Sequence, residues 1–293
     1  MAALVRIVRS EHVQTPSPAV SVVLPASNEA GLITHCLTVL AGSTWTLASP
    51  VEVIVVANGC RDDTAACART TSPLFAARGW TLRVIEREEG GKLGALNAGD
   101  GAAQAAIRVY LDADVTVSPD LLSRLHGALD APGPRYASGR VQITARGHVA
   151  RAYARIWRQV PFMTRGVPGC GVFAVNAAGR ARWGAFPDII SDDTFVRLSF
   201  APQERTAVNA PYDWPIAEGF GALIRVRRRQ DAGVDQIRAL YPALCANEDA
   251  LAFPTRRKLA IALRDPLGFA VYCGVALAVR LAPNPPKDWS RGR

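Results

Sequence analysis

Four short apolar runs, rich in β-branched residues, alternate with helix-like segments in the first part of the chain. They cover residues 20–24, 51–56, 81–85 and 107–111. Near-continuous apolar strands separated by helices are typical of a parallel sheet that is buried on both faces. The sequence therefore predicts an α/β fold, with a Rossmann-like, mainly parallel sheet and helices on both faces.

The second half of the chain is less regular. A basic amphipathic stretch at 148–160 is followed by a glycine-rich loop at 166–171 and a short apolar run at 173–175. We expect a catalytic domain over 18–235, with a nucleotide-binding half at 18–118 and an acceptor half at 119–235. A C-terminal helical appendage, 236–293, is expected to follow.

Charge and cysteine usage narrow the class of protein. The net charge of +9 and a pI near 9.7 favour anionic partners such as nucleotide phosphates, nucleic acid or an acidic membrane surface. The arginine-rich segment 225–229 lacks interleaved aromatic residues, which argues against a nucleic-acid surface. The six cysteines contain no CxxC pair, so we expect reduced thiols and a cytoplasmic location.

One segment near the C-terminus resembles a membrane element. Residues 266–279 are uncharged and mostly apolar, but they fall short of the ~20 residues needed to span a bilayer. Two interpretations remain: a buried core helix, or an in-plane anchor at the inner face of the cell membrane. Basic residues at 256–258 and 264 precede the segment and suit an anionic membrane surface.

Two aspartates directly follow the fourth apolar run. Residues i and i+2 of an extended strand point the same way, so Asp112 and Asp114 would face one space roughly 7 Å apart. Hard carboxylate oxygens suit Mg²⁺ or Mn²⁺. The alternative interpretation is a pair of acids in a solvated turn.

Polar or flexible residues also follow the other strands, and in such sheets ligands bind beyond the carboxyl ends. The backbone amides of residues 25–29 would either meet a nucleotide or simply cap a helix. Asn58 precedes Gly59, a pair typical of a tight turn. Lys92 opens a predicted helix, where its charge opposes the helix dipole unless an anion lies nearby. That conflict favours a phosphate contact.

Five motifs in order resemble a family 2 glycosyltransferase of GT-A fold over about 20–235. They lie at 24–29, 56–64, 92–99, 111–114 and 191–194. The resemblance implies a nucleotide-sugar donor, UDP- or GDP-linked, and a direct displacement that inverts the anomeric centre. Relatives often carry an acid where Ala57 stands, and many carry a Gln-x-x-Arg-Trp motif near 225–230. This chain lacks that tryptophan, which disfavours processive polymerisation.

The resemblance also implies residue roles. The donor-binding residues would be Pro25, Ala26, Asn28, Glu29, Asn58, Lys92, Asp112, Arg228 and Arg229. Asp114, with Asp112, would bind a divalent metal, Mg²⁺ or Mn²⁺. Asp193 would be the catalytic base, with Asp192 as the alternative. The acceptor-binding residues would be Gly169, Cys170, Gly171 and Trp214.

The sequence thus predicts an inverting glycosyltransferase that moves a single sugar to an acceptor hydroxyl, on a glycan or lipid-linked acceptor. Two alternatives remain at this stage. One is a nucleotidyltransferase on a similar sheet, although residues 25–29 lack the glycines and basic residues that such a loop needs. The other is a catalytically idle, membrane-bound scaffold with the same fold.

Overall fold

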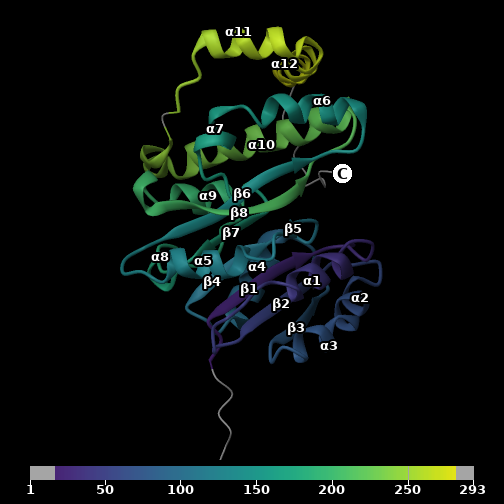
Figure 1. Cartoon of the computed structure of the whole chain (residues 1–293), viewed down its shortest axis with the longest axis vertical. Coiled ribbons are helices and arrows are strands. Elements are labelled where there is room, and N and C mark those ends of the chain that lie inside the picture. Colours follow the sequence, from purple (N-terminus) through teal and green to yellow (C-terminus); the bar gives the residue numbers. More distant parts are fainter. Residues whose placement is uncertain (1–16, 250, 282–293) are drawn as a thin grey trace, which may run out of the picture.

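The computed structural model describes residues 17–249 and 251–281, and in its first part strands alternate with helices (Figure 1). The strands are β1 (Val20–Ala26), β2 (Val51–Asn58), β3 (Thr81–Arg87), β4 (Ile107–Leu111) and β5 (Thr116–Val117). The helices are α1 (Ile33–Ala41), α2 (Thr64–Thr70), α3 (Ser72–Ala76), α4 (Lys92–Ala102) and α5 (Leu121–Leu129). All four predicted strands are present, so the alternation expected from the sequence is confirmed.

The second part adds three strands and several helices. The strands are β6 (Tyr136–Thr144), β7 (Val172–Val175) and β8 (Arg205–Pro215). The helices are α6 (His148–Trp157), α7 (Pro161–Arg165), α8 (Ala177–Arg180), α9 (Asp192–Leu198), α10 (Phe220–Leu240), α11 (Thr255–Arg264) and α12 (Pro266–Leu281). Two 3₁₀ turns, η1 (Pro202–Glu204) and η2 (Pro242–Asn247), connect them. The sequence had not indicated β6, β8 or the length of α10.

The eight strands within the described residues form one sheet in the order β3-β2-β1-β4-β7-β6-β8-β5. The four strands β3, β2, β1 and β4 are parallel, as expected for strands joined by helices. The other half is mixed, because β7 runs antiparallel to β4 and β6, and β5 runs antiparallel to β8. The predicted α/β fold is confirmed, and only its second half departs from parallel order.

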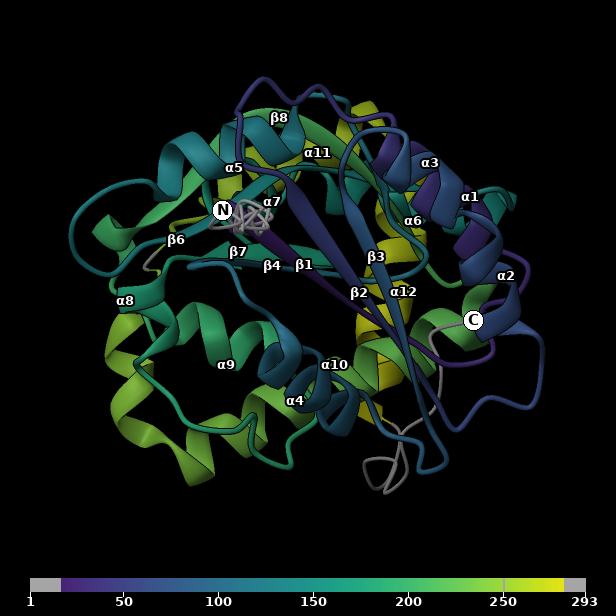
Figure 2. The same cartoon turned by 90° about the horizontal axis from the view of Figure 1, so that it is seen from below.

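Helices cover both faces of the sheet, as Figure 2 shows from below. One face packs Val22 and Leu24 of β1 against α1 and α5, through side chains such as Leu37 and Leu125. The opposite face packs Val23 and Tyr110 against α4 and α9. Because successive strand residues point to opposite faces, a near-continuous apolar run is what a doubly covered strand requires.

The C-terminal helices α11 and α12 lie at one end of the molecule, beyond α6 and α10 (Figure 1). Within the described residues, no helix has the length and apolarity that crossing a bilayer requires. Helix α10 runs continuously across the predicted domain boundary at 235, and the division of the chain into these segments stays a prediction. Residues 282–293 of the predicted appendage lie outside the described part.

Candidate functional site

The carboxyl ends of three parallel strands form one wall of a cavity of about 230 Å³. Ala26 of β1 pairs in register with Ala57 of β2, so the segments after both strands leave the sheet at one edge. The residues of this wall are Pro25, Ala26, Ser27, Glu29, Asn58, Lys92, Asp112, Ala113 and Asp114. Of the strand-end residues predicted from the sequence, all but Asn28 therefore line one space.

The facing wall comes from the second half of the chain. Its polar residues are Ser191, Asp192, Asp193, Arg227, Arg229 and Gln230. Its other residues are mostly aromatic or aliphatic: Tyr153, Trp157, Gly171, Ile190, Trp214, Pro215, Ile216, Ala217, Leu223 and Val226. The cavity thus has a polar end near the strand termini and an apolar region beneath α6 and α10.

Lys92 joins the two walls. Its ammonium nitrogen lies 2.9 Å from Oδ1 of Asp112 and 3.2 Å from Oδ2 of Asp192. Burial acts to lower the pKa of Lys92, but these two carboxylates outweigh burial and raise the pKa above its ordinary value. The lysine therefore carries its charge. Within this structure, protein carboxylates compensate the unfavourable interaction of this charge with the dipole of α4.

Asp192 and Asp193 begin α9 but occupy different environments. Asp192 is buried, and its burial raises its pKa to about 6 against the opposing effect of Lys92. Asp193 is half-buried, and its Oδ1 accepts a hydrogen bond from the backbone N–H of Thr194 at 2.7 Å. Both residues line the cavity, but the carboxylate of Asp192 is engaged by Lys92.

Two side-chain amides hold the segment that leads into α9. Asn97 of α4 accepts the N–H of Phe186 at 2.7 Å and donates to its carbonyl at 3.1 Å. Gln236 of α10 accepts the N–H of Ile190 at 2.8 Å. The approach to Asp192 is therefore tied to helices on either side of it.

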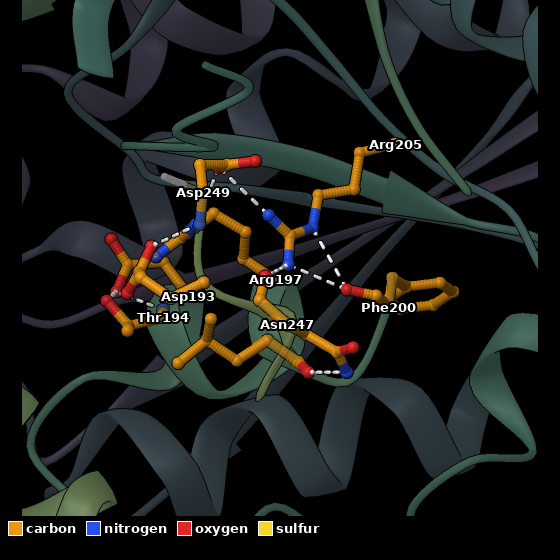
Figure 3. A network of polar contacts seen from close by, with 9 residues as sticks. Asp193, Thr194, Arg197, Phe200, Arg205, Asn247 and Asp249 are labelled. Carbon is orange, nitrogen blue, oxygen red and sulfur yellow. Dashed lines mark hydrogen bonds and ion pairs between the residues drawn. The ribbon is translucent and has the colours of Figure 1, made fainter. Parts of the chain in front are cut away.

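The far end of α9 is held by a buried arginine network, drawn in Figure 3. Arg197 lies 3.1 Å from Oδ2 of Asp249, and Arg205 of β8 lies 3.0 Å from the same oxygen. Arg197 also pairs with Glu248 at 2.8 Å. Asn247 donates to the carbonyl of Leu198 at 2.8 Å. This network joins the helix carrying Asp193 to the segment that follows α10.

The two aspartates after β4 lie on a turn, and the expectation of an extended strand is corrected here. Pairing of β4 with β7 ends at Leu111, and the N–H of Val115 bonds the carbonyl of Asp112 at 3.2 Å. The chain turns because it must cross from β4 to β5, which pairs with β8. Asp112 and Asp114 nevertheless both line the cavity.

The oxygen donors at this turn fit a divalent cation that is shared with a ligand. Among the residues that the structure describes, no group of three or more His, Cys, Asp or Glu side chains could hold a metal by itself. Mg²⁺ and similar cations commonly use one or two protein carboxylates and complete their shell with substrate phosphates and water. Asp112 and Asp114 match such a partial set.

Asn58 and Asn28 are engaged with the backbone of the rim. Asn58 donates to the carbonyl of Ala26 at 2.9 Å and accepts the N–H of Gly91 at 3.0 Å. Asn28 has a positive φ of 51° and accepts the N–H of Arg61 at 2.6 Å. Asn58 lines the cavity and Asn28 does not. Both residues thus stabilise the backbone at the rim of the cavity. Their contacts with a donor remain a prediction.

The predicted acceptor loop packs tightly behind the cavity. A Cβ on Gly169, whose φ is +68°, would lie 1.9 Å from Oη of Tyr136. On Gly171, with φ +75°, it would lie 2.6 Å from Val115 and 2.8 Å from Trp214. Gly171 and Trp214 line the cavity, whereas Gly169 and the buried Cys170 do not. The close approach that these glycines permit is thus made to protein side chains.

The arginine-rich segment lies on α10, where one helical face meets the cavity. Leu223, Val226, Arg227 and Gln230 follow the i, i+3, i+4, i+7 spacing of such a face and line the cavity. Of the two predicted arginines, Arg229 lines the cavity and Arg228 does not. Arg227, which the sequence reasoning missed, lies 2.9 Å from Asp231.

Sequence reasoning also missed the aromatic part of the wall. Tyr153 and Trp157 stand one helical turn apart on α6, and Trp157 packs edge-on against Trp214 at 5.4 Å between ring centroids. The amphipathic pattern at 148–160 marked the helix. It could not show that its apolar face would border a cavity as well as a core.

Comparisons with known proteins identify the family of the chain. Residues 21–182 match the sequence model of the family described as Glycosyl transferase family 2. The chain is also 34% identical over 128 residues to the glycosyltransferase AglE of Haloferax volcanii, a match that covers 43% of this chain and 40% of the relative. The chain therefore matches less than half of that relative's length.

Solved structures share the fold at low sequence identity. The mannosyltransferase PcManGT of Pyrobaculum calidifontis, solved with GDP-Man and Mn²⁺, superposes with a TM-score of 0.56 and 20% identity, covering 92% of this chain and 77% of that one. Glucosyl-3-phosphoglycerate synthase of Mycobacterium tuberculosis, solved with Mn²⁺, UDP and glucosyl-3-phosphoglycerate, gives 0.53 and 21%, covering 80% and 82%. TarS of S. aureus with UDP-GlcNAc gives 0.52 and 15%, covering 89% and 91%. These likenesses confirm the predicted GT-A-type fold.

Proposed function

The chain belongs to glycosyl transferase family 2. On that premise we propose that it is a glycosyltransferase, which transfers one sugar, with inversion, from a nucleotide-sugar donor to an acceptor hydroxyl. The observation that carries the proposal is the division of one cavity into two chemically distinct walls. Lys92, Asp112 and Asp114 lie on the strand-end wall, and Asp193 lies on the wall that faces it.

The donor would lie along the strand ends. Lys92, whose ammonium group lies between Asp112 and Asp192, would contact the diphosphate, and the segment 25–29 borders the same space. Structures that share the fold were solved with GDP-Man or with UDP and a divalent cation, which supports a nucleotide-sugar donor here, UDP- or GDP-linked.

Asp112 and Asp114 would hold Mg²⁺ or Mn²⁺ together with the diphosphate of the donor. When bound, the cation supplies neutralisation of the charge that develops on the leaving diphosphate. Asp112 would then share its carboxylate between the cation and Lys92, which contacts it at 2.9 Å.

Asp193 is assigned as the general base. It takes the proton of the acceptor hydroxyl as that oxygen bonds to the anomeric carbon and the bond to the diphosphate breaks on the opposite side. Such a base contributes about 10²–10⁴-fold to the rate. Asp192 is less suited to the role because its carboxylate is occupied by Lys92 at 3.2 Å.

The acceptor is proposed to be amphiphilic, such as a lipid-linked glycan. The wall that includes Asp193 also includes Tyr153, Trp157, Trp214, Ile216 and Leu223. Aromatic faces stack on sugar rings, and aliphatic side chains favour an apolar tail. The support for this acceptor class is the composition of that wall.

Turnover assays with the purified full chain test the proposal. UDP-, GDP- and dTDP-sugars are supplied with Mn²⁺, with Mg²⁺ or with a chelator, and donor cleavage is followed with hydroxyl acceptors. We expect metal-dependent turnover with one class of donor, and an α-linked donor should give a β-linked product in NMR spectra. A product that keeps the donor configuration would contradict inversion, and no turnover with any donor would contradict the function.

Asp193→Asn tests the base. We expect transfer to a hydroxyl acceptor to fall by about 10²–10⁴-fold while Mn²⁺-dependent binding of the nucleoside diphosphate is retained. Asp188→Asn is the matched control, because Asp188 is an aspartate of the same segment that does not line the cavity. Full hydroxyl transfer by Asp193→Asn would exclude Asp193 as the base.

A further inference from the structure

The two C-terminal helices carry an unusual set of exposed leucines. Five leucines of α11 and α12 are each 57–76% exposed: Leu259, Leu263, Leu267, Leu277 and Leu281. We call these five side chains together the leucine face. Exposed apolar side chains scattered singly are ordinary, but a contiguous set marks an interaction site.

The leucines follow helical spacing. Leu259 and Leu263 are four residues apart on α11, on the side opposite the buried Ile261. On α12, Leu277 and Leu281 repeat the same spacing, and Leu267 lies within the same sector of the helix. The leucine face is therefore an ordered stripe on each helix.

The other side of α12 is fixed to the body of the molecule. Val275 is fully buried in a cluster that includes Tyr153 and Trp157 of α6. Tyr272 stacks on Tyr153 with ring centroids 5.0 Å apart. Arg155 of α6 makes two hydrogen bonds, of 2.6 and 3.1 Å, to Asp265 at the corner between α11 and α12. The leucines of α12 thus point away from the side of this helix that packs against α6.

Charge indicates what would cover the leucine face. Residues 255–281 carry one acid, Asp265, which is paired with Arg155. The same segment carries five basic residues: Arg256, Arg257, Lys258, Arg264 and Arg280. A second copy of the chain would bring two such basic surfaces together, at an electrostatic cost. An apolar stripe flanked by bases instead matches lipid with anionic headgroups.

We propose that the leucine face is a membrane-docking surface on which α11 and α12 lie in the plane of an anionic bilayer. The leucines enter the boundary between headgroups and acyl chains, and the flanking bases contact the headgroups. The helices bind in the plane, consistent with the absence of a bilayer-crossing helix among residues 17–249 and 251–281.

Docking in this way also orients the cavity. Helices α6 and α10, which contact α12, supply Tyr153, Trp157, Leu223 and Val226 to the apolar cavity wall. The apolar region therefore lies one helix layer from the proposed lipid surface. A benefit for an amphiphilic acceptor rests on the function proposed above, whereas the docking itself does not.

Vesicle co-sedimentation of the full chain tests the proposal. Vesicles of phosphatidylcholine alone are compared with vesicles of equal parts phosphatidylcholine and phosphatidylglycerol, and we expect binding to the anionic vesicles. Leu263→Ser with Leu267→Ser should weaken that binding by about a hundredfold, because burial of one leucine is worth about tenfold or more in a partition constant. Arg256→Gln with Lys258→Gln should weaken it by about fivefold for each charge removed.

A matched control uses leucines elsewhere on the surface. Leu47→Ser with Leu74→Ser removes two exposed leucines near α1 and in α3, and should leave vesicle binding unchanged. Donor cleavage in solution is measured for every variant. Retained cleavage shows that a variant is folded, so loss of docking is distinguished from loss of activity.

Three results would overturn the proposal. In the first, the variant with Leu263→Ser and Leu267→Ser binds anionic vesicles as strongly as the control variant and the unaltered chain. In the second, the unaltered chain binds no vesicles and forms a dimer in analytical ultracentrifugation that Leu263→Ser with Leu267→Ser dissociates. In the third, the chain binds vesicles only after truncation beyond Leu281, which would make residues 282–293 the cover of the leucine face.

Discussion

The ammonium nitrogen of Lys92 lies 3.2 Å from Oδ2 of Asp192, although the two residues are far apart in the chain. This contact joins the start of α4, beside the strand ends, to the start of α9 on the facing wall. Because Lys92 also contacts Asp112 at 2.9 Å, its ammonium group links both walls of the cavity. Donor binding at the strand ends would therefore alter the contact between Lys92 and Asp192 at the start of α9.

Replacement of Lys92 should weaken donor binding. We expect Lys92→Met to reduce the affinity for a nucleoside diphosphate with Mn²⁺ by about tenfold to a hundredfold, since a hydrogen bond to a charged group is worth ~1.5–3 kcal/mol. Isothermal titration calorimetry measures the effect. Lys258→Met on α11 is the control and should bind normally. Equal affinities for both variants would place the diphosphate elsewhere.

Asp192 should make stability depend on pH in a defined direction. Its pKa is raised from 3.8 to about 6 by burial, so between these values the folded state holds a proton that the unfolded chain has lost, and stability falls as pH rises. Above about pH 6 the cost of the buried charge is fully present, and below about pH 4 it vanishes. Asp192→Asn should therefore raise the free energy of unfolding by about 1–3 kcal/mol near pH 7.5.

Urea titrations across this pH range, in chelator and without donor, measure that effect. The gain from Asp192→Asn should shrink as the pH falls toward 4. Asp130→Asn, at an exposed aspartate, should change stability by less than about 0.5 kcal/mol. A gain that is constant with pH would exclude ionisation of Asp192 as its cause.

Gly169 should be intolerant of a side chain. Its φ is +68°, and a Cβ added there would lie 1.9 Å from Oη of Tyr136. Gly169→Ala should therefore lower the free energy of unfolding by about 3 kcal/mol or more. Gly127→Ala in α5, where nothing lies within 4 Å, should instead be neutral or stabilising by up to about 1 kcal/mol. Thermal unfolding compares the two.

The partner of Gly169 offers a second variant. The hydroxyl of buried Tyr136 has no hydrogen-bond partner among the described residues. Tyr136→Phe should therefore cost little stability by itself and should recover part of the loss in Gly169→Ala. Strictly additive effects of the two substitutions would argue that the backbone angle, rather than the contact, is the cause.

Arg197 should act on catalysis through the position of α9. Arg197→Met leaves Glu248 and Asp249 with fewer partners and should cost about 2–4 kcal/mol of stability. Below the unfolding temperature, the kcat for sugar transfer should fall more than the affinity for donor. Arg124→Met breaks an exposed pair with Asp120 and should cost less than about 1 kcal/mol. Unchanged kcat in folded Arg197→Met would remove the positioning role.

Much of the first half of the fold could be predicted because its strands are buried on both faces. Residues 51–56 are all buried, and apart from Glu52 their side chains are apolar. Strand β8 gives a weaker signal. Val208, Ala210 and Tyr212 are buried while the intervening residues are more exposed, and prolines within the strand interrupt the pattern. Helix α10 carries arginines along a face that borders the cavity, which masks its apolar stripe.

The candidate site divides in the same way. Asp112 and Asp114 could be found because parallel strands bring their carboxyl ends to one edge, whatever the details of the loops. The turn that carries these aspartates, and the aromatic wall from α6, depend on how β5 and β8 pair and on how α6 packs. Such contacts join residues far apart in sequence, and no local pattern encodes them.

The alternation of strands and helices, the edge at which the polar residues gather and the family resemblance of the motifs can all be inferred from the amino-acid order. Three features became visible only in the folded chain: Lys92 bridges Asp112 and Asp192, Gly169 makes room for Tyr136, and the leucines of α11 and α12 remain exposed. Periodicity and strand ends reflect neighbours along the chain, whereas ion pairs, close contacts and exposure depend on segments that meet only after folding.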